Sequence, residues 1–169
     1  MKKRDLLAGL FLLVLMAGAT LLWLAPGGGR AVPAVTLPTL EGGTLDLEGH
    51  QGRPLVVTFW ASDCSGCLEE IPHLNALQRE YGQRGLEVIG IAMHYDPPAE
   101  VARTAERRGI GYTVALDRRG EAAEAFGNVQ LTPTTFLISP GGRIVYQKMG
   151  PPDWERVQGR LEDWLAGRA

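Results

Sequence analysis

The two cysteines of the chain lie three positions apart, at Cys64 and Cys67. They follow an apolar, β-branched run at 55–60 and open a segment with helical periodicity at 65–81. A thiol at the start of a helix meets free backbone N–H groups and the positive end of the helix dipole, and both lower its pKa. The position therefore favours a reactive thiolate at Cys64, with Cys67 one turn later and able to close a disulfide with it.

Two other uses of a cysteine pair stay open at this point. A structural disulfide across two intervening residues removes little chain entropy, so it would stabilise the fold only slightly. Two cysteines supply half of a tetrahedral zinc site, but no second Cys or His pair at zinc-finger spacing completes it. Copper(I) accepts two thiolates alone or with one further ligand. A copper(I) carrier that uses Cys64, Cys67 and His94 is therefore the alternative to a redox pair.

Charge is unevenly distributed along the chain. Basic residues cluster at 2–4, whereas the chain after Arg30 holds 13 basic and 18 acidic side chains. A mildly acidic domain is a poor candidate for nucleic-acid binding, which requires a basic surface.

The N-terminal segment has the sequence pattern of a membrane-targeting segment. Residues 6–25 carry no charge, and a helix of that length matches the bilayer core of roughly 30 Å. We expect a cytoplasmic segment at 1–5, a single-pass signal-anchor helix at 6–25, a Gly-rich linker at 26–30 and one folded domain at 31–169 outside the cytoplasm. A cleaved signal peptide competes with this interpretation, although its apolar region is usually shorter, about 7–15 residues. Disulfides form and persist outside the cytoplasm.

Periodicity along the domain predicts an α/β fold. The Gly-rich tripeptide at 41–43 predicts a hairpin between 35–40 and 44–47. The further predicted strands are 55–60, 86–92, 112–116, 134–138 and 143–147, and the predicted helices are 65–81, 97–108, 121–126 and a last one that Asp153 caps. This order implies a central mixed sheet with helices on both sides.

Two stretches carry a family resemblance. Residues 59–67 read FWASDCSGC, and residues 132–137 read TPTTFL. Together they resemble the thioredoxin superfamily, and more narrowly the membrane-anchored TlpA/ResA-like thiol-disulfide oxidoreductases. A CxxC at a strand-to-helix junction with Thr-Pro-Thr about 65 residues later is far more specific than a lone CxxC. The resemblance runs from the hairpin near Thr36 to the last helix and implies a thioredoxin-like fold with an N-terminal β-hairpin extension.

The resemblance also implies roles for individual residues. It implies a cis bond between Thr132 and Pro133, in a loop that faces the cysteines and pairs with an extended substrate segment. It implies that Trp60 covers the cysteine pair and contacts substrate, with a plain core residue as the competing interpretation. It implies that Glu70 helps to move protons, since a partly buried carboxylate has a raised pKa. The competing interpretation of Glu70 is a solvated glutamate like its neighbour Glu69.

The function that the resemblance implies is reduction of disulfides in exported proteins. A family substrate is apocytochrome c during cytochrome c maturation, with electrons from a membrane donor of the thiol-disulfide transporter type and no separate cofactor. The expected location is the bacterial cytoplasmic membrane, with the domain facing the periplasm or cell exterior. A peroxidase of the same broad fold would need a peroxidatic cysteine with its own threonine and arginine surroundings, which this stretch lacks.

Three positions depart from the family pattern. Asp63 stands where relatives usually have tryptophan, and Gly66 where they often have proline. Thr58 aligns with the buried aspartate of thioredoxin itself. A carboxylate beside Cys64 opposes thiolate formation, so these departures bear on the reduction potential rather than on the chemistry.

Overall fold

The computed structural model describes residues 13, 16, 29–50 and 52–168. The predicted cytoplasmic segment at 1–5, the predicted anchor at 6–25 and the predicted linker at 26–30 lie outside the described residues, except at positions 13, 16, 29 and 30. Among the helices of the described part, none combines the length and apolar character that crossing a membrane requires.

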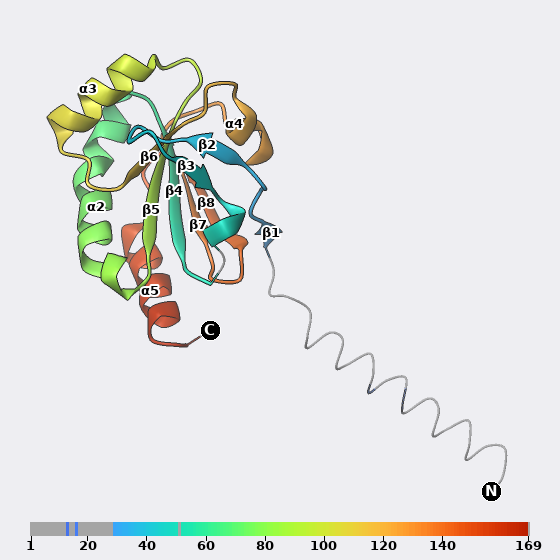
Figure 1. The fold of residues 1–169 in the computed structure, drawn as a ribbon. Helices are drawn as coiled ribbons and strands as arrows, with labels where there is room; N and C mark the ends of the chain where they lie inside the picture. Colours follow the sequence, from blue (N-terminus) through green and yellow to red (C-terminus); the bar gives the residue numbers. More distant parts are fainter. Residues whose placement is uncertain (1–12, 14–15, 17–28, 51, 169) are drawn as a thin grey trace, which may run out of the picture.

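A six-stranded mixed sheet forms the centre of the domain, in the order β1-β8-β7-β4-β5-β6 (Figure 1). Its strands are β1 (Arg30–Ala31), β4 (Leu55–Trp60), β5 (Glu87–Ala92), β6 (Thr113–Leu116), β7 (Thr134–Ile138) and β8 (Arg143–Met149). Strands β4, β5 and β6 run parallel, whereas β7 pairs antiparallel with both β4 and β8, and β1 pairs antiparallel with β8. The predicted mixed sheet is confirmed.

Helices cover both faces of this sheet, as predicted. They are α2 (Ser65–Tyr81), α3 (Pro98–Arg108), α4 (Glu121–Ala125) and α5 (Trp154–Leu165), with short 3-10 turns η1 (Glu48–His50) and η2 (Gly82–Arg84). Asp153 caps α5 as expected, since its carboxylate accepts the backbone N–H of Arg156 at 3.1 Å.

The predicted hairpin forms a separate two-stranded sheet of β2 (Thr36–Pro38) and β3 (Thr44–Asp46). Leu40 donates its backbone N–H to the carbonyl of Val114 at 2.9 Å, so the hairpin docks against the outer strand β6. Its apolar side chains Leu37 and Leu45 join the core on the same sheet face as α4. The hairpin therefore partly protects an edge strand that would otherwise be open.

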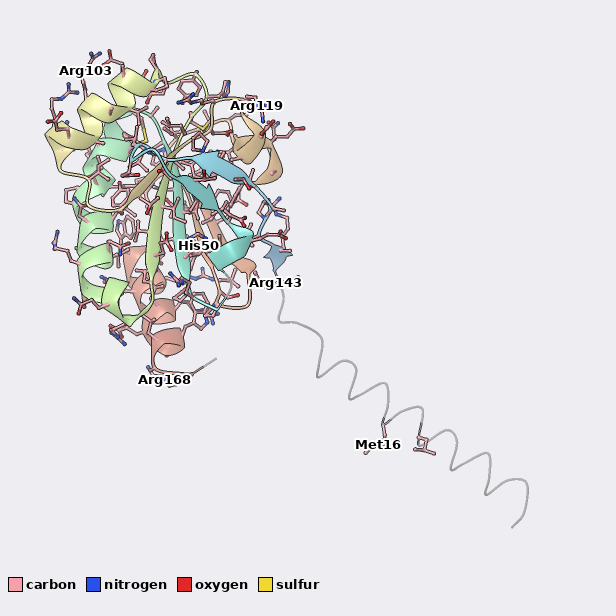
Figure 2. All side chains as sticks on the ribbon, in the orientation of Figure 1. Met16, His50, Arg103, Arg119, Arg143 and Arg168 are labelled. Atoms are coloured by element: carbon pink, nitrogen blue, oxygen red, sulfur yellow. A yellow bond between two sulfur atoms is a disulfide. The ribbon has the colours of Figure 1, made fainter. Side chains whose placement is uncertain are left out.

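The central strand β4 is buried on both faces, as its apolar sequence predicts. Val57 and Phe59 point to the face that the hairpin and α4 cover, whereas Val56 and Trp60 point to the face that α2 and α5 cover. Side chains fill the space on both sides of the sheet (Figure 2). This packing holds the carboxyl end of β4, and the cysteines that follow it, in a fixed place.

Candidate active site

The cysteine pair lies at the junction between strand β4 and helix α2. Cys64 is the N-cap residue of α2, and it forms a disulfide with Cys67 with an S–S distance of 2.11 Å. The backbone N–H of Cys67 donates to the sulfur of Cys64 at 3.2 Å. Because the amino end of a helix attracts negative charge, this position favours a thiolate at Cys64 once the disulfide is opened.

The two sulfurs differ in access. Cys67 is only 3% exposed and belongs to the hydrophobic cluster between α2 and the sheet, whereas Cys64 is half-buried and packs at its border. An incoming disulfide can therefore reach Cys64 but not Cys67.

The Thr132–Pro133 peptide bond is cis, and Pro133 faces the cysteine loop. A Cβ atom placed on Gly66 would lie 3.5 Å from Cδ of Pro133, which brings the two predicted stretches into contact. The carbonyl of Pro133 accepts the N–H of Gly150 at 2.8 Å, and the hydroxyl of Thr134 donates to the carbonyl of Leu131 at 2.7 Å. These bonds hold the loop beside the disulfide.

Glu70 lies on the buried face of α2, one turn after Cys67. It is 5% exposed, and neither carboxyl oxygen has a hydrogen-bond partner. Burial raises the pKa of Glu70 from 4.5 to about 7, because desolvation disfavours the charged form. A carboxyl that titrates near neutral pH beside a cysteine is suited to exchange protons with it.

Trp60 does not lie where the expected contact with substrate requires. Its side chain is 2% exposed and packs in the same cluster as Cys67. Its indole N–H is buried without a partner. The geometry therefore favours a core position for Trp60, because a buried ring offers no surface to a substrate.

Sequence reasoning missed Asp96, which fixes the loop before Cys64. Its carboxylate accepts the backbone N–H of Ser62 at 2.5 Å and the hydroxyl of Ser62 at 2.7 Å. Asp96 is 8% exposed, and it precedes α3, far from the cysteines in sequence. The Asp63 side chain next to Cys64 is exposed. No local sequence pattern predicts the Ser62–Asp96 hydrogen bonds, because they join residues 34 positions apart.

The buried position at Thr58 holds no ionisable group. Thr58 is 2% exposed, and its hydroxyl accepts the hydroxyl of Thr135 at 3.2 Å. Glu70 is therefore the buried carboxyl nearest in sequence to the cysteine pair.

The described residues do not place His94 in a metal-binding cluster with the two cysteines. They contain no group of three or more His, Cys, Asp or Glu side chains that could hold a metal ion. His94 is exposed, and its ring contacts Tyr95 with 5.5 Å between ring centroids. The neighbouring Met93 is 2% exposed and faces the core.

Comparisons with known proteins agree with this geometry. The redoxin family model matches residues 28–163. Thiol-disulfide oxidoreductase ResA of Bacillus cereus is 28% identical over 174 residues, which covers 98% of this chain and 97% of that protein. ResA of Halalkalibacterium halodurans is 32% identical over 139 residues, which covers 82% of this chain and 77% of that protein. A solved structure of a thiol:disulfide interchange protein of the thioredoxin family, from Chlorobium tepidum, has a TM-score of 0.73 at 25% identity and covers 83% of this chain and 99% of that chain.

Proposed function

The chain belongs to the redoxin family as a ResA-like member of the thioredoxin superfamily, and from that premise we propose that it reduces disulfide bonds in exported proteins. Its activity class is thiol-disulfide oxidoreductase, with the Cys64–Cys67 pair as the redox centre. The observation that carries the proposal is the unequal access of the two sulfurs at a helix N-terminus beside a cis-proline.

In the proposed reaction Cys64 is the nucleophile. Its thiolate attacks one sulfur of a substrate disulfide, which forms a mixed disulfide and releases a substrate thiolate that takes up a proton. Cys67 then loses its proton and attacks the Cys64 sulfur. This step forms the Cys64–Cys67 bond and releases the second substrate sulfur. Two electrons pass to the substrate, and the pair must be reduced again before the next turnover.

Glu70 is the proposed base for the second step. Cys67 is too buried to lose its proton directly to water, and Glu70 lies one helical turn away, where i and i+3 side chains are neighbours. With a pKa of about 7, this carboxyl is partly ionised near neutral pH and can accept the Cys67 proton.

Thr132 and Pro133 are the proposed docking residues for substrate. Proline lacks an N–H, and among the described residues no hydrogen bond engages the backbone of Thr132. An extended segment can therefore pair with Thr132 as an added strand, which presents its disulfide to Cys64. The neighbouring Leu131 is 59% exposed and offers an apolar contact to the same segment.

The proposed location, substrate and electron donor rest on the sequence and on the family resemblance. The uncharged stretch at 6–25 supports a membrane anchor with the domain outside the cytoplasm. The resemblance to TlpA/ResA-like oxidoreductases implies apocytochrome c as the substrate and a membrane thiol-disulfide transporter as the electron donor.

Two measurements test the proposal. Cys67→Ser should accumulate mixed disulfides with substrate, because Cys64 can attack but nothing resolves the product, whereas Cys64→Ser should abolish reduction of insulin. Thiol labelling in redox buffers gives the midpoint potential of the pair. A midpoint potential below about −220 mV supports a reductant. A midpoint potential of about −120 mV would make the protein an oxidant and would contradict apocytochrome c reduction as its function.

A further inference from the structure

A hollow of about 360 Å³ lies beside Cys64 and has no part in the chemistry above. It begins at Ser62 and Asp63, which directly precede Cys64 in the chain. Asp96 also lines it and accepts both hydrogen bonds from Ser62, so the hollow is fixed to the loop that carries the nucleophile. The cis-proline contacts the same loop elsewhere, at Gly66. A substrate that reaches Cys64 therefore has a second surface within reach, besides the cis-proline loop.

The hollow continues along α3, away from Cys64. Its lining takes Glu100, Thr104 and Arg107 from successive turns of that helix, which starts two residues after Asp96. Arg107 lies seven residues beyond Glu100, a helical rise of about 10 Å. Its guanidinium donates to the hydroxyl of Thr104 at 3.0 Å, and Thr104 is 1% exposed. The basic side chain of the hollow is therefore held toward the far end from the nucleophile.

The end of the hollow nearest Cys64 carries an uncompensated negative charge. Asp63 is exposed, and among the described residues it forms no ion pair. The carboxylate of Glu100 is paired with Arg103, which is labelled in Figure 2. The carboxylate of Asp96 is engaged by the two hydrogen bonds described above. Within this described lining, Asp63 is the carboxylate that is left to bind a ligand.

Tyr95 gives the same end of the hollow an aromatic wall. Its side chain is 51% exposed, and its ring lies edge-to-face with His94 at 5.5 Å between the ring centroids. The face of an aromatic ring attracts cations, because it carries the negative part of the ring quadrupole. An exposed ring and an unpaired carboxylate together favour a cationic side chain over a neutral or anionic one.

Charge over the whole domain favours the same ligand. After Arg30 the chain holds 18 acidic and 13 basic side chains, an excess of five acidic ones. The long-range field of such a domain accelerates its encounter with a basic segment. A cation against Asp63 also offsets the charge that opposes the Cys64 thiolate, so it favours the reactive form of the nucleophile.

We propose that Asp63 and Tyr95 form a specificity subsite for a lysine or arginine side chain that flanks the substrate cysteine. The inference rests on the proposed function, because it names the class of substrate that the Cys64–Cys67 pair reduces: disulfides in basic segments. Disulfide exchange follows the steps given above, and the subsite adds no further reactant. Asp63 and Tyr95 contact the flanking side chain and no reacting sulfur, so they determine specificity rather than chemistry.

The test uses three synthetic peptides that differ only next to one cysteine of an intramolecular disulfide. The positions on both sides of this cysteine hold lysine, glutamine or glutamate. The reduced full-length protein is mixed with each peptide at low ionic strength, and acid quenching followed by chromatography gives the second-order rate constant of reduction. The readout is the ratio of the rate constants for the lysine and glutamate peptides. A general change in the reactivity of Cys64 cancels in this ratio.

Wild type should reduce the lysine peptide roughly tenfold faster than the glutamate peptide, because one exposed charge pair attracts and the other repels. Added salt should shrink this ratio. Asp63→Asn should remove most of the preference, whereas Asp63→Glu should retain it. Tyr95→Leu keeps the apolar bulk but loses the ring face, so it should lower the ratio roughly threefold. Glu69→Gln is the matched control, because it removes an exposed carboxylate outside the hollow, and it should leave the ratio unchanged.

The same ratio in wild type and Asp63→Asn, or an equal fall in Glu69→Gln, would overturn the subsite while disulfide reduction stands. A preference for the glutamate peptide would mean that Arg107 selects the substrate, and it would also overturn the subsite. If the reduced wild type reduced none of the three peptides, the proposed function would fall, and the subsite with it.

Discussion

The burial of Glu70 predicts a stability that falls as pH rises. Below pH 4.5 the carboxyl is protonated in both the folded and the unfolded chain, so it adds no pH dependence. Between pH 4.5 and about 7 the unfolded chain ionises while the folded chain keeps the proton. The free energy of unfolding therefore decreases across this window, which is the opposite of the usual salt-bridged carboxylate.

The size of this effect follows from the two pKa values. A rise from 4.5 to about 7, at about 1.36 kcal/mol for each pKa unit, corresponds to about 3 kcal/mol above pH 8. Glu70→Gln replaces the carboxyl by a neutral group of the same shape, so it removes this penalty. The variant should gain about 3 kcal/mol relative to wild type between pH 4.5 and pH 8. Any cost of burying the amide adds equally at every pH.

Urea unfolding of the oxidised protein at several pH values measures this difference. The contributions of all other titrating groups cancel in the comparison of variant with wild type. Glu69→Gln is the matched control, because Glu69 lies on the same helix but is exposed, and it should show no such pH-dependent gain. Parallel pH curves for wild type and Glu70→Gln would refute the reasoning, since they would mean that the folded carboxyl titrates as in the unfolded chain.

Three further predictions concern the surroundings of the site and the last helix. Asp63→Asn should lower the pKa of the Cys64 thiol, because the substitution removes an exposed negative charge next to this thiol. Ultraviolet absorbance of the thiolate, recorded against pH, measures this pKa. A shift in the pKa that persists at high salt would argue against a direct charge effect. Asp96→Ala leaves the N–H and hydroxyl of Ser62 without their acceptor, so the free energy of unfolding in urea should fall by roughly 1–3 kcal/mol. A variant as stable as wild type would mean that this loop does not depend on the Ser62–Asp96 hydrogen bonds. Asp153→Ala removes the cap of α5 and should cost about 1 kcal/mol by the same method; no loss would show that the cap is redundant.

Local patterns were enough to predict the elements that carry the cysteines. The predicted strand at 55–60 and helix at 65–81 agree with β4 and α2 to the residue. An unbroken apolar, β-branched run identifies a buried strand, and a 3.6-residue repeat of apolar positions identifies a helix. Both patterns lie within a few consecutive residues, so they can be recognised without knowing what the element packs against. The cis bond before Pro133 came from the family resemblance, and it is confirmed.

The depth at which each side chain is buried was decided by the tertiary structure. Leu68 of α2 is apolar but only half-buried, whereas the carboxyl-bearing Glu70 on the same helix is buried. Local sequence patterns do not separate Glu69 from Glu70, and only the family resemblance singled out Glu70, because the pKa of a carboxyl depends on the water that other elements exclude from it. Trp60 of β4 and Tyr112, just before β6, pack in the same cluster as Cys67 of α2, and only the folded sheet brings these segments together.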